Sequence, residues 1–301
     1  MTSTSQQSKL SSWFWATRPF SLSASVAPVL VGSAFAASLK SMDWLLFALV
    51  LSGSMAIQIG TNLTDEYSDH RSSGGSGKFL APHKVIQRRL LSERAVLAGM
   101  IGAFSYAVTA GLVIVALTGW PILAIGAMSV AAAFFYSGGP YPLGNLGLGE
   151  PVVFLFMGPL TVMGAFYAQV ETFTWGSFWV SLPVAFIVTA ILHCNNLRDV
   201  DEDREVSKRS IAMALGPTPS RWLYAGLLAA AYGTIVALAA IDVISPWGLA
   251  GLLPTPWAVG SVRMLLAADD RPAMNRVMVR SAKIHGWTGV TLAAGLLYAT
   301  L

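Results

Sequence analysis

The densest cluster of charged side chains in this hydrophobic chain lies between residues 191 and 216. Asp199 and Asp203 are four residues apart, so on a helix their carboxylates project from one face, as two ligands of one divalent cation must. Lys208 and Arg209 follow shortly afterwards. An acidic pair beside a basic pair suits a diphosphate that carries Mg²⁺, because the metal binds the carboxylates and the bases bind the phosphate oxygens. The alternative is a solvated loop whose charges pair with one another.

A second acidic stretch, over residues 62–74, repeats this spacing. Asp65 and Asp69 are also four residues apart, and each precedes its counterpart, Asp199 or Asp203, by 134 residues. Aspartates are costly near hydrocarbon, and two facing clusters repel one another unless a cation lies between them. Oxygen ligands without a spaced His or Cys set favour Mg²⁺ over a transition metal. The predicted metal ligands are Asp65, Glu66, Asp69, Asp199 and Asp203, and the predicted substrate contacts beside them are Asn62, Asn195 and Asn196.

The composition predicts an integral membrane protein. Of the 301 residues, 54% are hydrophobic and only 11% are charged, whereas charged residues make up about a quarter of a soluble domain. In a soluble chain the net charge of +4 would suggest a nucleic-acid partner, but in a membrane protein the bases report topology instead, so no nucleic acid is expected. The single cysteine, Cys194, excludes an internal disulfide and is expected to be a small buried side chain.

Nine nearly uncharged segments are long enough, or almost long enough, to cross a bilayer. Small residues over 33–37 give the first segment some likeness to a secretory signal. It is longer than the apolar part of such signals, however, and many segments follow it, so we expect a retained helix. The predicted spans cover residues 20–39, 44–61, 95–118, 120–136, 151–170, 173–194, 222–241, 243–262 and 284–301.

The positions of the bases predict the orientation. If the N-terminus is cytoplasmic, 18 of the 19 Lys and Arg residues lie on the cytoplasmic side, and only Lys40 lies outside. The polar loops that hold both acidic stretches lie on that same side. We therefore expect an active site that faces the cytoplasm, in the inner or plasma membrane of a bacterial cell.

The equal spacing of the acidic stretches, four spans apart, indicates an internal duplication. Two pseudo-repeated four-helix halves, followed by one further helix, would bring both acidic pairs to one cavity. Between the halves lies a Gly- and Pro-rich loop over 136–150, which cannot be a continuous helix. Tyr136 would present its ring or its hydroxyl to a ligand there, and a plain interhelical turn is the alternative.

Three blocks of sequence carry a family resemblance. They are Arg18-Pro19 leading into residues 26–32, Tyr136-Ser-Gly-Gly-Pro140-Tyr141-Pro142 with Gly147-Leu-Gly149-Glu150, and Asn195-Asn196-Leu-Arg198-Asp199 with Asp203, Lys208 and Arg209. These blocks resemble the UbiA superfamily of intramembrane prenyltransferases, most closely its branch that acts on 1,4-dihydroxy-2-naphthoate in menaquinone biosynthesis. The resemblance extends over nearly the whole chain, and it implies one membrane-embedded domain over 1–301, an all-α bundle of about nine transmembrane helices.

The resemblance also implies a polyprenyl diphosphate donor, two Mg²⁺ ions and an aromatic acceptor. Metal and bases would stabilise the leaving diphosphate so that the allylic C–O bond ionises, with Asp65, Asp69, Asp199 and Asp203 as the catalytic carboxylates. A ring such as that of Tyr136 would stabilise the carbocation, and an aromatic carbon would then attack it. With the naphthoate, the ring carboxylate is lost as carbon dioxide, and Arg198 is expected to hold it beforehand. The residues expected to bind the diphosphate oxygens are Arg71, Lys78, Lys208 and Arg209.

Three other functions remain open. A sister enzyme with 4-hydroxybenzoate, homogentisate, a chlorophyllide or haem as acceptor would keep both acidic stretches. A divalent-cation transporter would also use intramembrane carboxylates, but it would place them near the midplane with an exit on the other face. A lipid-binding scaffold without activity explains neither the paired acids nor the bases beside them.

Overall fold

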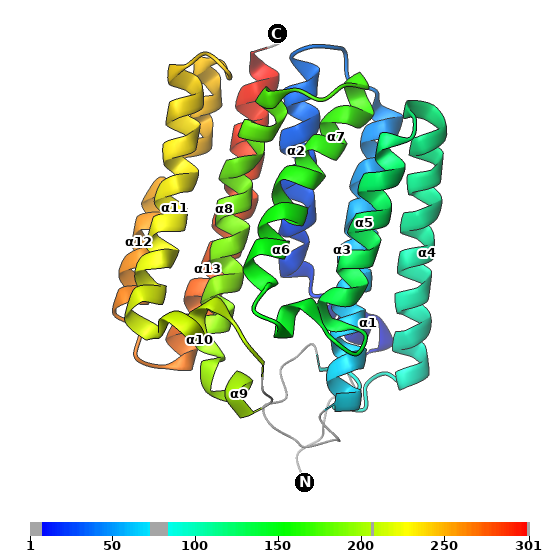
Figure 1. The fold of residues 1–301 in the computed structure, drawn as a ribbon, viewed down its shortest axis with the longest axis vertical. Coiled ribbons are helices and arrows are strands. Elements are labelled where there is room, and N and C mark those ends of the chain that lie inside the picture. The colour runs from blue at the N-terminus through cyan, green and yellow to red at the C-terminus, as the bar shows by residue number, and fades with distance from the viewer. Residues whose placement is uncertain (1–7, 73–83, 206–207, 300–301) are drawn as a thin grey trace.

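The computed structural model describes residues 8–72, 84–205 and 208–299. Every regular element in these ranges is a helix, and one isolated β-bridge joins Leu146 to Arg209. The long helices run side by side along one axis (Figure 1). The prediction of an all-α protein is therefore confirmed.

Seven helical columns are long and apolar enough to cross a membrane. Two more run alongside them: α5 (Pro121–Ser137), which has only 17 residues, and α13 (Arg271–Tyr298), which carries four bases in its first half. Within the described ranges these columns match the nine predicted spans in order. The seven are η1 (Pro19–Leu22) with α2 (Ser23–Ala37), α3 (Trp44–Ser72), α4 (Glu93–Thr118), α6 (Gly149–Leu155) with η3 (Phe156–Leu160) and α7 (Thr161–Val170), α8 (Trp175–Arg198), α11 (Pro217–Ala240), and η4 (Pro246–Leu252) with α12 (Thr255–Leu266).

The helix α3 continues to Ser72, well past the predicted end of its span at residue 61. Hydropathy falls after residue 61, but no Gly or Pro occurs before Gly74, so the polar sequence keeps the helical conformation. The first acidic stretch is thus helical up to Ser72. Four short helices lie outside the predicted spans: α1 (Lys9–Ala16), the 3-10 helix η2 (Leu143–Asn145), α9 (Val200–Glu205) and α10 (Ile211–Leu215).

The column formed by α6, η3 and α7 has an irregular turn at Pro159. Proline has no N–H to donate, so the helix widens locally into a π-turn. Within this turn the hydroxyl of Thr161 donates a hydrogen bond to the carbonyl of Phe156 at 2.6 Å. At Gly158 a side chain would collide with Ala185 of α8, so this glycine allows the column to pack closely against α8.

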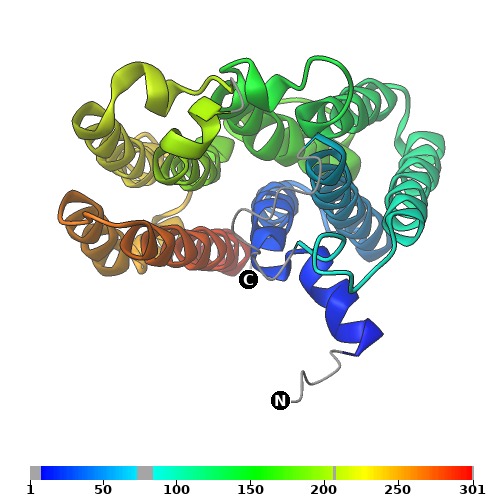
Figure 2. The same ribbon diagram turned by 90° about the horizontal axis from the view of Figure 1, so that it is seen from below.

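The largest buried core lies where α2, α7, α8, α11 and α13 meet. The helix α2 is enclosed by α3, α7, α8 and α13 (Figure 2). Hydroxyl groups join α11 to α13, since Tyr224 and Ser281 share a hydrogen bond of 2.5 Å. Cys194 is buried in the same core, as predicted. Fully buried members of this core are Val31, Phe166, Ile187, Tyr224 and Ile284.

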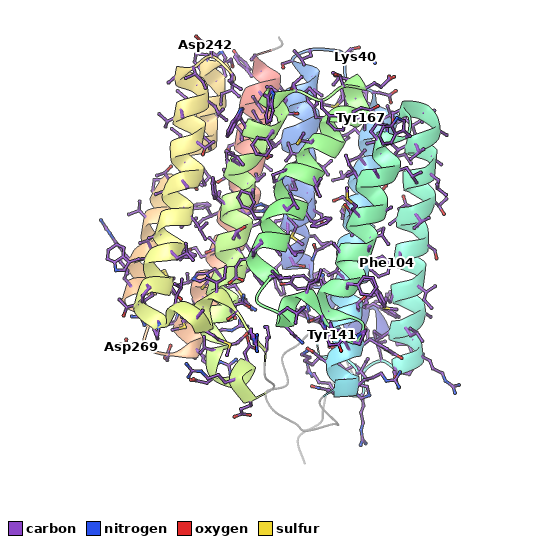
Figure 3. The ribbon with its side chains drawn as sticks, viewed as in Figure 1. Lys40, Phe104, Tyr141, Tyr167, Asp242 and Asp269 are labelled. Atoms are coloured by element: carbon purple, nitrogen blue, oxygen red, sulfur yellow. The ribbon has the colours of Figure 1, made fainter. Side chains whose placement is uncertain are left out.

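Both acidic stretches lie at one end of the bundle. There α3 and α8 end and the loop after α5 runs between them (Figure 1). Tyr141 and Asp269 lie toward this end, while Lys40 and Asp242 lie in short connections at the opposite end (Figure 3). The neighbours also repeat, because α3 packs against α4 as α8 packs against α11. The end that holds the acids is called the acidic end below.

Candidate active site

The aspartates of the first stretch lie one turn apart on α3, and each is paired with a base from another segment. Arg18 forms an ion pair with Asp65, whose other oxygen accepts a hydrogen bond of 3.0 Å from Ser137 of α5. Lys84, which follows the undescribed residues 73–83, pairs with Asp69. Three separate segments therefore meet at the acids of α3.

Arg18 has an unusual backbone conformation. Its φ of 49° lies in the left-handed region, which is uncommon for residues other than glycine. It lies in the turn between α1 and η1, directly before Pro19, and this turn brings its side chain to Asp65. Strained backbone of this kind often accompanies functional sites, and the ion pair to Asp65 gives this instance a specific role.

Asn62 and Glu66 lie on the same helix but contact the supporting segments. The amide of Asn62 donates to the carbonyl of Thr17 at 2.9 Å and to the hydroxyl of Ser21 at 3.0 Å, which holds the turn that contains Arg18. Glu66 is buried and accepts a hydrogen bond of 2.9 Å from the amide of Ile86. In this structure both side chains organise the positions of the bases, and their roles toward metal and substrate stay predictions.

Two further bases, Arg71 and Lys78, were predicted to bind substrate near the first stretch, and the structure describes only Arg71. Arg71 is exposed, donates to the hydroxyl of Tyr67 at 2.9 Å and faces Glu93 at 3.9 Å. It therefore lies at the mouth of the site with weak, solvated partners. Lys78 lies outside the described residues.

The first aspartate of the second stretch is the most strongly paired acid of the site. Asp199 lies directly after α8 and accepts two hydrogen bonds from Arg198, at 2.8 and 2.6 Å. Arg271 of α13 adds a third at 2.6 Å. Burial raises the pKa of Asp199, but these hydrogen bonds and charges outweigh burial, so its pKa lies below the ordinary value.

Asp203, one turn further on α9, has a different environment. It is buried and pairs with Lys208 at 2.9 Å. Burial raises the pKa of Asp203 above its ordinary value, although Lys208 opposes this effect, and the charges of Asp199 and Glu202 add to it. The pKa of Asp199 is therefore lowered, and the pKa of Asp203 is raised.

The remaining residues of the second stretch link it to other segments. The side-chain oxygen of Asn195 accepts a hydrogen bond of 2.8 Å from Arg198. The amide group of Asn196 donates to Glu150 of α6 at 3.0 Å. Arg209 joins the stretch to the loop after α5, because its backbone N–H donates to the carbonyl of Asn145 at 2.9 Å. Its side chain is exposed and forms no ion pair with any described residue.

Tyr136 lies where the two stretches approach each other. Its ring covers Gly144, where an added β-carbon would lie 3.3 Å from a ring carbon, and its hydroxyl would lie 3.3 Å from a β-carbon on Gly149. It also lies close enough to Asp65 and Asp203 to feel both charges. Tyr136 thus lies between the two acidic stretches in the last turn of α5, so the predicted loop begins two residues later than expected, and the role of this tyrosine toward a ligand stays a prediction.

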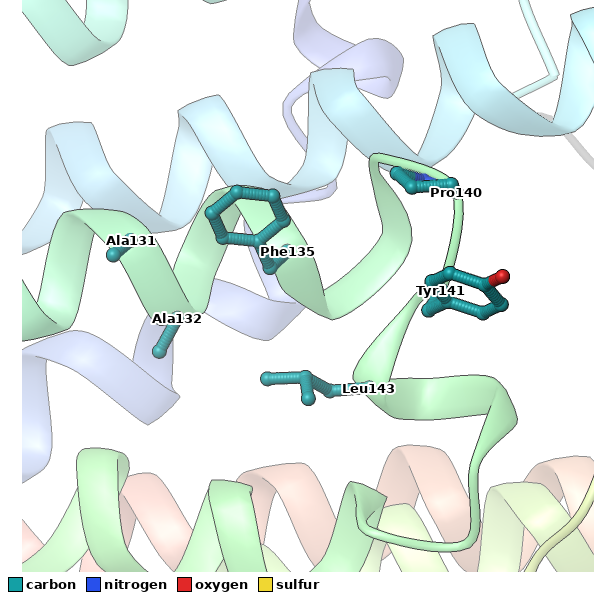
Figure 4. A pocket seen from close by; sticks show the side chains of 6 residues that line it. All are labelled: Ala131, Ala132, Phe135, Pro140, Tyr141 and Leu143. Carbon is teal, nitrogen blue, oxygen red and sulfur yellow. The ribbon is translucent and has the colours of Figure 1, made fainter.

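Two cavities border this loop. A polar one of about 400 Å³ is lined by side chains of α3 together with loop residues that include Pro142 and Asn145. An apolar one of about 440 Å³ lies between α5 and the loop, lined by Phe135, Tyr141 and Leu143 among others (Figure 4). A polar and an apolar compartment thus adjoin at the acidic end. The polar cavity contains both aspartates of the first stretch, Asp65 and Asp69.

Three bases of the site escaped the sequence analysis as site residues. Arg18 was noted only as part of a sequence block, and Lys84 and Arg271 gave no local signal at all. Arg18 and Arg271 reach their aspartates from 47 and 72 residues away in the chain, and Lys84 reaches Asp69 from 15 residues away. Only the folded structure brings them to the acids.

The donor atoms fit a hard divalent cation by their chemistry. Carboxylate oxygens in pairs suit Mg²⁺. Among the described residues no three His, Cys, Asp or Glu side chains are gathered as a ready-made metal centre, and each of the four site aspartates is paired with Lys or Arg. Their role as metal ligands stays a prediction.

Residues 25–287 match the UbiA prenyltransferase family, which is most of the chain. The chain belongs to this family. It is therefore a prenyltransferase and an integral, multi-pass membrane protein, and the resemblance noted in the sequence is confirmed.

Named relatives cover nearly the whole chain. It is 33% identical over 247 residues to the 1,4-dihydroxy-2-naphthoate octaprenyltransferase of Mycobacterium tuberculosis, covering 82% of this chain and 83% of that protein. The enzyme of the same name from Bacillus subtilis is 30% identical over 281 residues, with coverages of 93% and 90%.

Solved structures share the fold. The apo structure of a UbiA homolog from Aeropyrum pernix aligns with a TM-score of 0.72 at 15% identity, covering 93% of this chain and 98% of the other. A homolog from Archaeoglobus fulgidus bound to GPP and Mg²⁺ aligns with a TM-score of 0.55 at 12% identity, with coverages of 93% and 99%.

Proposed function

We propose that this protein transfers a polyprenyl group from polyprenyl diphosphate to 1,4-dihydroxy-2-naphthoate in a reaction that requires Mg²⁺. The observation that carries the proposal is the meeting of two aspartate pairs at one end of the bundle, each aspartate already beside a base, with Tyr136 between them. Relatives that bear the name of this activity support the choice of acceptor.

The aspartates would hold the metal, and Mg²⁺, when bound, supplies positive charge that stabilises the departing diphosphate. The residues proposed for this role are Asp65, Asp69, Asp199 and Asp203, with Glu66 and Asn62 as the additional ligands predicted from the sequence.

The bases now paired with the aspartates would bind the diphosphate. Arg18, Lys84 and Lys208 lie within ion-pair distance of a carboxylate, so a small side-chain movement brings each to a phosphate oxygen beside it. The exposed Arg209 and Arg71 would act at the mouth, together with Lys78. Asn195 and Asn196 would add polar contacts.

Ionisation of the allylic C–O bond leaves the electron pair on the diphosphate and a carbocation on the prenyl group. The ring of Tyr136 would stabilise this cation through its face and keep water from it. The electron-rich ring carbon of the acceptor then forms the new C–C bond, and cleavage of the bond to its carboxylate releases carbon dioxide. Arg198 would hold that carboxylate before its loss.

The location follows from the substrate. A long prenyl chain stays in lipid while its diphosphate reaches the acidic end, and the positive-inside distribution of bases favours the cytoplasmic side for this end. The apolar cavity beside the loop offers a surface for hydrophobic parts of the substrates. We propose a bacterial plasma membrane as the site.

The test is prenyl transfer in membranes that contain this protein. Labelled farnesyl or longer diphosphate is supplied with 1,4-dihydroxy-2-naphthoate, and Mg²⁺ is either present or chelated. The expected result is a prenylated, decarboxylated naphthalenediol, recovered as its quinone after oxidation, that forms only with Mg²⁺. Prenylation of 4-hydroxybenzoate or homogentisate instead would overturn the acceptor and keep the mechanism. Product formation that is unchanged in chelator would overturn the role of the metal.

A further inference from the structure

A buried polar cluster lies behind the second acidic stretch. Glu150 is the second residue of α6 (Gly149–Leu155), and His193 and Asn196 lie one turn apart on α8. Their exposed fractions are 3%, 0% and 3%. One carboxylate oxygen of Glu150, Oε1, contacts both His193 Nδ1 at 3.2 Å and the amide nitrogen of Asn196 at 3.0 Å. A single buried atom thus links the start of α6 to the last turns of α8, directly before Asp199.

The hydrogen-bond partners of His193 determine how many protons its two ring nitrogens and Glu150 hold. Its Nε2 lies 3.1 Å from the backbone carbonyl of Ser220, and a carbonyl can only accept, so Nε2 carries a proton. The contact between Nδ1 and Glu150 must then hold one proton, either on the imidazole or on the carboxyl group. In both cases the remaining lone pair of Oε1 faces Asn196.

Because one proton lies between His193 Nδ1 and Glu150, the orientation of the Asn196 side-chain amide is determined as well. Oε1 accepts from Asn196 whichever partner holds the shared proton, so Asn196 must present its NH₂ group to Glu150. Its Oδ1 is then turned away from Glu150, and no described residue donates a hydrogen bond to it. An unused carbonyl oxygen therefore remains three residues before Asp199.

The second oxygen of Glu150 strengthens this reading. Oε2 is buried without a hydrogen-bond partner among the described residues. A buried oxygen without a partner lowers stability. An apolar residue at this position would avoid that penalty, and the retained carboxylate is better explained by what it does to its neighbours.

We propose that Glu150 and His193 are positioning residues that hold Asn196 with its amide oxygen directed at the metal–diphosphate site. This inference rests on the proposed function, because it assumes that a diphosphate with Mg²⁺ binds beside Asp199. The outer partners of metal-site residues commonly act in this way, by fixing the orientation of the groups that touch the ligand.

Glu150→Gln is the sharpest test because it reverses donor and acceptor in the hydrogen bond between residue 150 and Asn196. With Nε2–H held by Ser220, Nδ1 of neutral His193 accepts, so the introduced glutamine turns its NH₂ group toward it. The same NH₂ group then faces Asn196 and turns the Asn196 oxygen inward. The variant is nearly isosteric, so packing is preserved.

The measurement is binding of a farnesyl thiodiphosphate, which does not ionise readily, to the detergent-solubilised full-length protein over a range of Mg²⁺ concentrations. Glu150→Gln and Asn196→Ala are each expected to weaken Mg²⁺-dependent binding about tenfold. The double variant should be no weaker than Asn196→Ala alone, since Glu150 acts through Asn196. Tyr232→Phe, which removes another buried hydrogen bond at 3.2 Å from Thr288, is the matched control and should bind normally.

Each outcome has a separate meaning. If the wild type does not bind the analogue, the proposed function fails. If the wild type binds and Glu150→Gln binds equally well, or if the two substitutions are additive, the positioning role is overturned. Should Glu150→Gln not fold, Asn196→Ala alone decides, because tight Mg²⁺-dependent binding in that variant contradicts the proposal.

Discussion

The two acidic stretches share their residue spacing but differ in local structure. Asp65 and Asp69 lie on the uninterrupted helix α3, whereas Asp199 occupies the break between α8 and α9. The side chain of Asp69 is 48% exposed and has Lys84 beside it, while that of Asp199 is 16% exposed and is held by two guanidinium groups. Exposed pairs exchange partners at little cost, and buried ones resist it. The same sequence pattern thus yields one adaptable and one preorganised half-site.

The largest expected effect tests whether both halves hold the metal. Asp69→Asn and Asp203→Asn should each lower kcat/KM for prenyl transfer by about 10²- to 10³-fold, because each removes a carboxylate proposed to hold the metal, whose positive charge would stabilise the leaving diphosphate by several kcal/mol. The assay is prenyl transfer at matched protein levels. Asp269→Asn, an exposed acid at the same end, is the control and should keep wild-type activity. Near-normal activity in either variant would show that the substituted aspartate is not a metal ligand.

Substitution of the bases should have a smaller effect, and this effect should differ between the two acidic stretches. Lys84→Gln is expected to raise the KM for the polyprenyl diphosphate by about tenfold, since charge-assisted hydrogen bonds contribute roughly 1.5–3 kcal/mol. Arg271→Gln should raise it less, because Arg198 still holds both oxygens of Asp199. Steady-state kinetics with varied diphosphate measure both. Lys283→Gln, an exposed base of α13 outside the site, serves as the control, and equal effects of Lys84→Gln and Arg271→Gln would contradict the asymmetry.

The smallest effect concerns pH and stability. The pKa of Asp199 is lowered in the folded protein, so its contribution to stability is present above the ordinary pKa of about 4 and is lost as the pH falls through the lowered value. Asp199→Asn should therefore lower the thermal unfolding midpoint at about pH 7 and have progressively less effect below about pH 4. Unfolding in detergent, followed at several pH values, measures this. If the loss of stability does not change with pH, the effect comes from packing and not from the charge of Asp199.

Much of the architecture could be predicted because hydropathy is a local property. The nine columns follow from runs of apolar residues, and the common end of the two acidic stretches follows from counting those columns. The end of α3 was placed too early, since helix continuation depends on the absence of Gly and Pro and not on hydropathy. Helix α1 is too short for the membrane criterion that identified the spans.

The partners of the acids are long-range features of the fold. Nothing near Arg271 in the sequence indicates that it reaches Asp199, 72 residues away. The cluster around Glu150 was equally hidden, because its three side chains come from two helices and its meaning lies in hydrogen-bond directions. Sequence patterns identify which groups can react, and three-dimensional packing decides which groups face one another.

The pairing of each of the four site aspartates with an internal base has a consequence for substrate binding under the proposed function. The site carries its own counterions, so a free cation would compete with Lys and Arg, and a free anion would compete with carboxylates. A ligand that brings both charges together satisfies all partners at once. We expect Mg²⁺ or inorganic diphosphate added singly to bind weakly in calorimetry, and the two added together to bind far more tightly. Under the proposed function, this site would bind the complete metal–diphosphate complex tightly and each separate component only weakly.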